Sequence, residues 1–326
     1  MSVDHLHQKT QNAVKFSNLD ILNKTLIKIA KFDKDIVVLT ADSRLSGKID
    51  QFAKLYPERI IEVGIAEQNL VGVAAGLASC GKKPFVVSQA CFLTTRALEQ
   101  IKVDVAYCEN PVRLIGISAG ISYGALGATH HAISDFASLR AIPNIHIIAP
   151  ADNKETEAAI LSTLSSPMPA YIRLGKRALT NIHKDAAKID INKASVIKKG
   201  KDILVLATGE TVQICLDAAE ELKKYEIIPT VVSVPTIRPL DNASLLEFCK
   251  SHRSVIVCEE HSINGGLGDA IARLLMEYGI ACRFVSLGIP DEPICNGSQL
   301  DVLAHYGISR EGITKTVLEM IKVIDL

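Results

Sequence analysis

The chain has 326 residues, of which 48% are hydrophobic, and its 36 acidic residues balance 36 basic ones. This length predicts two domains, and the zero net charge argues against a large basic surface for nucleic acid or an anionic membrane. No apolar run approaches the roughly 18 to 20 residues needed to cross a bilayer, so no membrane partner is expected.

The N-terminal segment, MSVDHLHQKTQ, is polar and lacks the apolar core of a secretory signal. The eight cysteines form no CxxC pair, and most of them lie in apolar runs. This usage is typical of buried, reduced thiols. We therefore expect a cytoplasmic protein.

Short β-rich runs alternate with helical patterns in the first part of the chain. Strands are predicted at residues 36–40, 60–63, 84–88, 112–117, 145–148 and 170–173, and helices at 19–31, 67–79, 93–108, 135–141 and 153–164. The alternation is typical of an α/β domain with a mostly parallel sheet covered on both faces.

A polar, lysine-rich stretch at residues 181–201 predicts a linker and an edge strand. The alternation then resumes, with strands predicted at residues 203–207, 230–234, 254–258 and 282–285, and helices that begin at residues 211, 242, 267 and 310. We therefore expect two α/β domains, residues 1–185 and the smaller 186–326.

The segment from Arg59 to Gly76 reads RIIEVGIAEQNLVGVAAG. A short apolar run predicts a buried strand, Gly64 ends it, and a helix rich in small residues begins near Glu67. Glycine inside a helix costs up to about 1 kcal/mol relative to alanine, which indicates close packing, a subunit interface or a bound ligand. A carboxylate in the first turn also has a simpler role, because it complements the helix dipole.

Three segments resemble the thiamine-diphosphate enzymes of the transketolase family: GIAEQN with VAAGLA, GATHHAISDFASLRAIPNIHIIAPAD, and EEHSINGGLGDAIA. The resemblance extends over about residues 12–320 and is close to the transketolase and deoxyxylulose-phosphate synthase branches, but only to their C-terminal half. It implies a pyrimidine-binding domain followed by the smaller transketolase C-terminal domain.

The resemblance also implies cofactor-binding residues. Glu67 would hydrogen-bond the aminopyrimidine ring of thiamine diphosphate and favour its imino tautomer, which removes the thiazolium proton. Phe92 would stack on that ring, although a plain core phenylalanine is the alternative. Ile65 and Gln89 would line the same pocket. Gln89 and Leu98 replace aromatic residues of many transketolases, so the pocket is expected to be less aromatic.

For the substrate, the resemblance implies that His130 faces the thiazolium, acts as a catalytic residue and holds donor-sugar hydroxyls. His131 takes the position of the family's glutamine and would assist. Arg173 would bind the terminal phosphate, with Ser46 as a helper, because guanidinium donors match a tetrahedral anion. The alternative for Arg173 is an ion pair at the domain boundary.

The glycine-rich segment 118–131, SAGISYGALGATHH, predicts a flexible loop over the site and not a phosphate cradle. Within it, Ser118 and Leu126 replace a histidine and an aspartate that read sugar hydroxyls in some transketolases. His261, in EEHSINGGLG, is not expected to be catalytic, and the GGLG that follows could bind an anion. The resemblance gives this second domain mainly a role in assembly.

The chain has no GDG motif followed by a later asparagine, the family signature for Mg²⁺ and the diphosphate. We therefore expect no metal site here, and a partner, the N-terminal subunit, that carries this motif and holds Mg²⁺ or Ca²⁺. The helix at 66–79 would face the partner across a tight interface in an α2β2 heterotetramer. The chain would be active only in that complex.

The sequence thus predicts the C-terminal subunit of a two-subunit transketolase, which moves a two-carbon ketol group from a ketose or ketose phosphate to an aldose. The β subunit of a 2-oxo acid dehydrogenase first component is one alternative, since it has a similar length and plan. A 1-deoxyxylulose-5-phosphate synthase-like half and an inactive paralogue are others. The sugars stay open, and branched or sulfonated sugars are conceivable.

Overall fold

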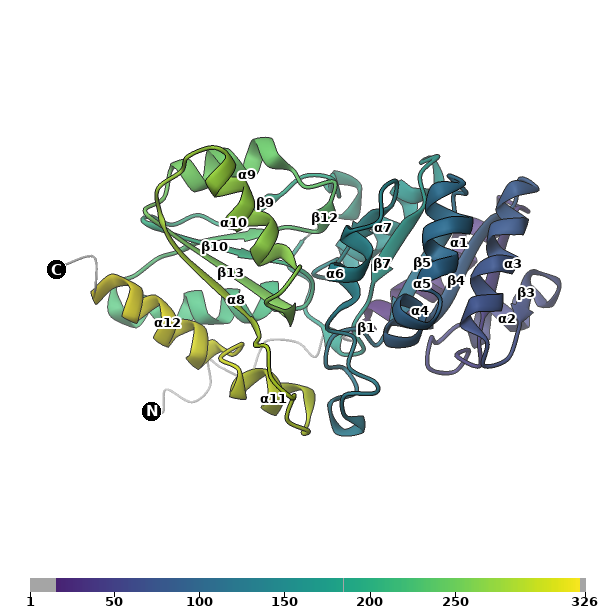
Figure 1. Cartoon of the computed structure of the whole chain (residues 1–326), viewed down its shortest axis with the longest axis horizontal. Coiled ribbons are helices and arrows are strands. Elements are labelled where there is room, and N and C mark those ends of the chain that lie inside the picture. The colour runs from purple at the N-terminus through teal and green to yellow at the C-terminus, as the bar shows by residue number, and fades with distance from the viewer. Residues whose placement is uncertain (1–15, 184, 323–326) are drawn as a thin grey trace, which may run out of the picture.

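The computed structural model describes residues 16–183 and 185–322, so the polar N-terminal segment lies outside the described residues. Two α/β domains lie side by side, each built around its own sheet (Figure 1). This confirms the predicted fold class, a mostly parallel sheet in the first domain followed by a smaller α/β domain.

The first domain contains six parallel strands and one antiparallel strand, in the order β12-β6-β7-β5-β4-β2-β3. The parallel strands are β2 (Ile36–Thr40), β3 (Ile60–Glu62), β4 (Lys83–Gln89), β5 (Arg113–Ile117), β6 (His146–Ile148) and β7 (Ala170–Arg173). Their helices are α1 (Asn18–Ala30), α2 (Asp50–Leu55), α3 (Glu67–Ser79), α4 (Ala90–Arg96), α5 (Leu98–Gln100), α6 (Asp135–Arg140) and α7 (Asn153–Leu164).

Local sequence explains most of these elements. All five residues of β2 and of β5 are buried, as expected for central strands covered on both faces. Helix α1 begins with a capping box, in which Ser17 and Asp20 each accept the other's backbone N–H. The helix predicted at 93–108 is instead broken into α4, α5 and a π-helical segment, Ile101–Tyr107.

The strand order creates a switch point between β2 and β4. The chain runs from β2 to β3 on one side, and from β4 to β5 on the other. In open α/β sheets, ligands bind at the carboxyl ends of the strands at such a point, because the flanking loops diverge there. This crevice is where the predicted site residues are expected.

The second domain has a five-stranded sheet in the order β14-β13-β10-β11-β9. Its strands are β9 (Ser195–Lys198), β10 (Ile203–Ala207), β11 (Thr230–Ser233), β13 (Ser254–Ser262) and β14 (Arg283–Ile289). Its helices are α8 (Thr211–Glu221), α9 (Asn242–Lys250), α10 (Leu267–Glu277), α11 (Gln299–His305) and α12 (Arg310–Lys322). Strand β9 is antiparallel and lies at the edge, which confirms the predicted edge strand.

The second part of the chain contributes one strand to the sheet of the first domain. Strand β12 (Thr236–Arg238) belongs to the second part by sequence but pairs with β6 and completes the first sheet. Near the start of the described chain, β1 (Phe16–Ser17) pairs with β8 (Ala178–Leu179). Prolines flank β12, and it has only three residues, so the sequence did not predict it.

Half of the cysteines, Cys91, Cys215, Cys249 and Cys258, are buried, and all eight are free thiols in the described structure. Two others, Cys80 and Cys108, are exposed, contrary to the expectation of buried thiols. Among the residues that the structure describes, no helix combines the length and the apolar character needed to cross a bilayer.

Candidate active site

Glu67 opens α3 at the carboxyl end of β3 and is 1% exposed. One of its oxygens accepts a hydrogen bond from Nη1 of Arg96, whose side chain is 42% exposed. Burial raises the pKa of the neighbouring Cys91 thiol to about 11, and the Glu67 charge acts in the same direction. Ile65, which we expected to line the same pocket, is 73% exposed, so Glu67 is covered by other residues.

Phe92, in α4, is linked to this carboxylate through Arg96. Its ring lies 4.7 Å from the centre of the Arg96 guanidinium and 5.3 Å from the His130 ring centroid. Phe92 and Arg96 are one helical turn apart, so the i, i+4 spacing could have identified Arg96 as a neighbour. Phe92 is half-buried at the edge of a small apolar cluster and is not a core residue.

Gln89 and Ser46 meet at the switch point. Gln89 ends β4, and its amide donates to the Ser46 hydroxyl over 3.3 Å, while its carbonyl accepts from Ser43, which follows β2. Ser46 in turn donates to the Ser43 carbonyl at 3.1 Å. The structure therefore brings together two predicted residues that are 43 positions apart in the sequence.

Residues 118–132 carry both histidines that the resemblance places near the donor sugar, and we call this segment the donor loop after that prediction. Nδ1 of His130 lies 2.9 Å from the Thr129 hydroxyl, and its ring packs edge-on against Tyr123, with centroids 5.8 Å apart. The ammonium of Lys176 lies 4.8 Å from the Tyr123 centroid. His131 is buried, and its Nε2 is 3.1 Å from the Gly124 carbonyl, so it braces the loop from within.

Arg173 lies at the domain boundary and is 8% exposed. Its Nε donates to Asp135 at 2.8 Å, and its Nη2 donates to the carbonyls of Ala132 and Glu260. Asp135 also accepts from the Tyr171 hydroxyl at 2.7 Å. This matches the alternative considered for Arg173, an ion pair at the domain boundary: Asp135 belongs to the first domain, and the Glu260 carbonyl extends the contact to the second. The phosphate contact of Arg173 stays a prediction.

Replacing Arg173 by methionine is expected to lower the free energy of unfolding by about 3–5 kcal/mol, because Asp135 would keep a buried, unpaired charge. Urea unfolding followed by circular dichroism measures the loss. Arg44→Met is the matched control, since its pair with Asp50 is exposed and contributes about 1 kcal/mol or less. Unchanged stability with a weaker affinity for phosphorylated donors would instead favour the phosphate role.

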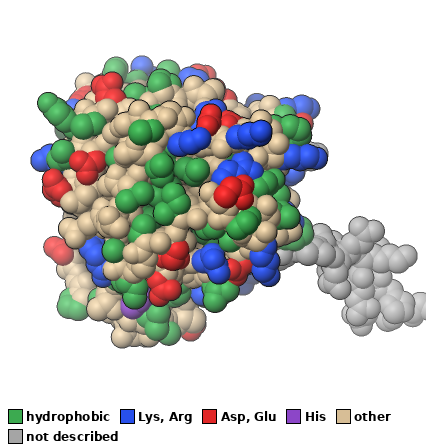
Figure 2. Space-filling view, turned by 90° about the vertical axis from the view of Figure 1, so that its right-hand side faces the viewer, with side chains coloured by type: hydrophobic (Ala, Val, Ile, Leu, Met, Phe, Trp, Pro, Cys, Tyr) green, Lys and Arg blue, Asp and Glu red, His purple; other side chains and the backbone are tan. Residues whose placement is uncertain are grey.

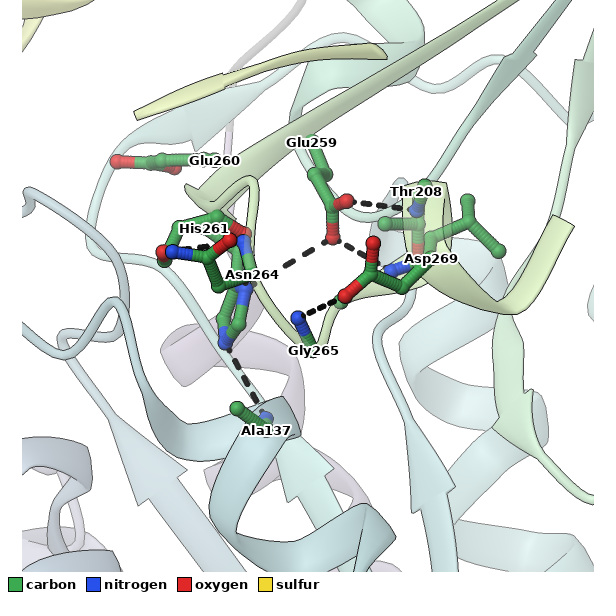
Figure 3. Close-up of polar contacts among 12 residues, drawn as sticks. Ala137, Thr208, Glu259, Glu260, His261, Asn264, Gly265 and Asp269 are labelled. Carbon is green, nitrogen blue, oxygen red and sulfur yellow. Dashed lines mark hydrogen bonds and ion pairs between the residues drawn. The ribbon is translucent and has the colours of Figure 1, made fainter. Parts of the chain in front are cut away.

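The GGLG segment of the second domain is closed to external anions. Both Glu259 oxygens accept backbone N–H groups at the start of α10, from Leu267 and Gly268, each at 2.7 Å. Figure 3 shows this carboxylate between β13 and α10. Burial raises the pKa of Glu259 to about 7. The Glu259 carboxylate thus occupies the position at the start of α10 where the sequence suggested that an anion could bind.

His261 is buried between the domains, close to the Glu259 carboxylate (Figure 3). Burial lowers its pKa to about 4, and its partners fit the neutral ring: Nδ1 donates to the Ser262 carbonyl at 2.7 Å, and Nε2 accepts from the Ala137 N–H at 3.4 Å. Its ring stacks on Phe136. These contacts account for both nitrogens and support a structural role.

The family of the chain follows from comparison with known proteins. Residues 15–181 match the transketolase pyrimidine-binding domain, and residues 192–313 match the transketolase C-terminal domain. The chain therefore belongs to the transketolase family.

Within residues 16–183 and 185–322, no group of three or more histidines, cysteines or acidic residues is placed to hold a metal.

Several relatives are named as transketolase subunits. The chain is 40% identical, over 91% of its length and 95% of the relative's, to one subunit of the apulose-4-phosphate transketolase of Phocaeicola vulgatus. It is 36% identical, over 82% of its length and 85% of the relative's, to the 6-deoxy-6-sulfo-D-fructose transketolase subunit SqwH of a Clostridium species. The chain is also 36% identical, over 95% of its length, to the 1-deoxy-D-xylulose-5-phosphate synthase of Pelotomaculum thermopropionicum. The match covers only 50% of that longer protein.

Among solved structures, a split-gene transketolase described as an inactive β4 tetramer superposes with a TM-score of 0.83 and 33% identity. The match covers 94% of this chain and 98% of that one. The transketolase of Campylobacter jejuni shares the fold, with a TM-score of 0.78 and 22% identity over 94% of this chain. This chain covers 47% of its length.

Proposed function

We propose that this chain is the C-terminal subunit of a two-subunit transketolase that transfers a two-carbon ketol group from a ketose or ketose phosphate to an aldose. The observation that carries the proposal is the buried Glu67 carboxylate next to the switch point of the sheet, with one guanidinium, that of Arg96, contacting both Glu67 and the Phe92 ring. A carboxyl group beside an aromatic face suits a flat heteroaromatic ring with a basic nitrogen.

Thiamine diphosphate supplies the chemistry that breaks and remakes the carbon–carbon bond. Glu67 would hold a proton against ring nitrogen N1′ of the cofactor, and Phe92 would stack on the ring. In the chain alone, the Arg96 guanidinium takes the position expected for this ring, because it is hydrogen-bonded to Glu67 and lies over the Phe92 ring. Arg96 must therefore leave this position when the ring enters. Ile65, which is exposed, and Gln89 would complete the lining.

The donor sugar would lie along the side chains that lead away from Phe92. His130 comes first and would hold hydroxyl groups next to the reacting carbon, with Ser46 and His131 as supporting groups. Tyr123 and Lys176 follow in the same row. Lys176 is exposed and forms no ion pair with any described residue, so its charge is available to a substrate anion, whereas that of Arg173 is balanced by Asp135.

Replacing Lys176 by methionine is expected to raise KM for a phosphorylated donor about tenfold or more and to leave kcat nearly unchanged, because a contact to a charged group is lost away from the reacting carbon. Steady-state kinetics of the assembled enzyme measure this. The exposed Lys315→Met is the control. An equal loss with a neutral donor would contradict an anion contact.

The partner would dock on the face that carries β3 and α3. Figure 2 views this side and shows hydrophobic side chains gathered near its centre, with charged residues around them. Leu45 is 80% exposed, and an added Cβ on Gly72 or Gly76 of α3 would meet no other atom within 4 Å. Small residues and exposed apolar groups allow close approach of a second subunit. That subunit would hold Mg²⁺ or Ca²⁺ and the diphosphate, in a cytoplasmic α2β2 heterotetramer.

The names of the relatives suggest the sugars to test. Two are subunits of an apulose-4-phosphate transketolase, and one acts on 6-deoxy-6-sulfo-D-fructose. Here Ser118 is buried with no partner for its hydroxyl among the described residues, and Leu126 is exposed. A donor whose hydroxyl pattern differs from that of ordinary ketose phosphates fits such a loop.

The experiment is reconstitution with the N-terminal subunit from the neighbouring genes. The mixture is expected to bind thiamine diphosphate with Mg²⁺ and to transfer a ketol group from at least one branched, sulfonated or ordinary ketose donor. Pyruvate decarboxylation without ketol transfer would support the 2-oxo acid dehydrogenase alternative. Deoxyxylulose 5-phosphate formation would support the synthase alternative. A complex that binds no cofactor would overturn the proposal.

A further inference from the structure

The donor loop is closed at its base by a two-residue bridge. The Gly120 N–H donates to the Ala132 carbonyl at 3.1 Å, and the Ala132 N–H donates to the Gly120 carbonyl at 2.8 Å. Everything between these residues, including Tyr123 and His130, projects from this base. The orientation of the loop therefore depends on what holds the bridge.

The end of β13, in the second domain, holds both sides of the bridge. Oε1 of Glu260 accepts the Ile121 N–H at 2.7 Å, and the Ser262 N–H donates to the Ile133 carbonyl at 2.9 Å. Gly120 has φ +62°, and a Cβ at this position would collide with the Glu260 carboxylate. Glu260 is almost fully buried, so this contact is not screened by water.

The same carboxylate is linked to the tip of the loop. Oε1 of Glu260 also accepts from the side-chain amide of Gln299, the first residue of α11, at 2.8 Å. The segment just before α11 packs on the tip, where a Cβ on Gly124 would collide with the Gly297 carbonyl and one on Gly127 would lie 3.0 Å from the Asn296 amide oxygen. Figure 1 shows this loop, in teal, at the lower edge of the molecule beside α11.

These contacts correct the expectation of a flexible loop. Gly120, Gly124 and Gly127 each lie where a side chain would press on the second domain, so they serve close packing. One oxygen of Glu260 takes one donor from the base of the loop and one from the helix that supports its tip. A hydrogen bond to a charged acceptor is about twice as strong as a neutral one, which suits a single anchoring point.

We propose that the second domain orients the donor loop through Glu260, which acts as a positioning residue for the donor-sugar contacts of His130. The proposal rests on the proposed function insofar as His130 contacts the donor. It gives the second domain a part in donor recognition beyond assembly. Glu67 and Phe92 lie in α3 and α4, outside this loop, so the positioning applies to the donor and not to the cofactor.

The test compares Glu260→Ala, Glu260→Gln and the exposed control Glu247→Ala in the reconstituted complex. Glu260→Ala is expected to lower kcat/KM for the donor about tenfold or more, mainly through KM, and to change the Kd of thiamine diphosphate less than about twofold. Glu260→Gln keeps an acceptor oxygen and is expected to recover most of the loss. Gly120→Ala, which attacks the same contact from the loop side, is expected to reproduce the Glu260→Ala defect.

Hydrogen exchange of the folded complex provides a second measurement. Glu260→Ala is expected to speed amide exchange in residues 118–132 and to leave α3 and α4 unchanged. The positioning role would be overturned if the kinetics and the amide exchange of Glu260→Ala matched those of the wild type. It would also be overturned if this variant lost as much affinity for thiamine diphosphate as for the donor. A wild-type complex without ketol transfer would refute the proposed function instead, while the exchange experiment would still test how Glu260 holds the loop.

Discussion

Replacing Glu67 by glutamine is expected to lower the kcat of the assembled enzyme by at least about 100-fold, which is the lower end of the range for a lost general acid–base group. The amide keeps the size of the side chain and can still contact N1′, but it cannot exchange a proton with it. Steady-state kinetics give kcat, and calorimetric titration shows whether thiamine diphosphate still binds. Cofactor affinity within about tenfold of wild type is expected, because most of the binding contacts stay in place.

The control for this variant is Glu157→Gln. Glu157 is a carboxylate of the same domain that pairs with Lys28 on the surface, far from the switch point in the fold. Its loss is expected to leave kcat unchanged, because exposed pairs contribute little. A reconstituted complex that binds the cofactor and keeps full turnover with Glu67→Gln would refute the assignment of Glu67.

The second large effect is expected from omission of the partner. The chain by itself is expected to show no thiamine diphosphate binding and no turnover at cofactor and Mg²⁺ concentrations that saturate the complex. The described residues supply a carboxylate and an aromatic ring for the pyrimidine, but no cluster that could hold the metal of a diphosphate. In addition, the Arg96 guanidinium is hydrogen-bonded to the Glu67 carboxylate in the free chain, where the cofactor ring would bind.

Calorimetry with and without the N-terminal subunit measures this dependence. Activity is expected to rise with added partner and to level off at equal numbers of the two chains. Mass measurement should accompany each titration to detect self-assembly, because the similar split-gene transketolase is described as an inactive β4 tetramer. Cofactor binding or turnover by this chain alone would contradict the proposed division of the site.

Much of the fold could be predicted because buried parallel strands and long helices have strong local patterns. Strands β2 and β7 and helices α3 and α7 have the predicted bounds. The pattern failed where tertiary contacts decide the structure. Strand β12 exists only because β6 offers an open edge, and α11 is a seven-residue helix that follows a loop packed on the first domain.

The candidate site was predictable to a different extent. Motifs identified Glu67, Phe92 and His130, and the structure places Phe92 beside both of the others through Arg96 and a direct ring contact. Contacts that depend on distant segments could not be read from the sequence. The pairing of Arg173 with Asp135 spans 38 positions. Lys176 reaches Tyr123 because the strands that precede them in the chain, β7 and β5, are neighbours in the sheet.

The placement of β12 has a consequence for any attempt to dissect the protein. A fragment cut between residues 185 and 186 would carry the whole first-domain sheet except β12, so β6 would keep β7 on one side but become an unpaired edge strand on the other. Unprotected strand edges recruit other chains, and such a fragment would tend to self-associate. A separable pyrimidine-binding module would need residues 236–238 grafted back, or charged residues placed along the β6 edge.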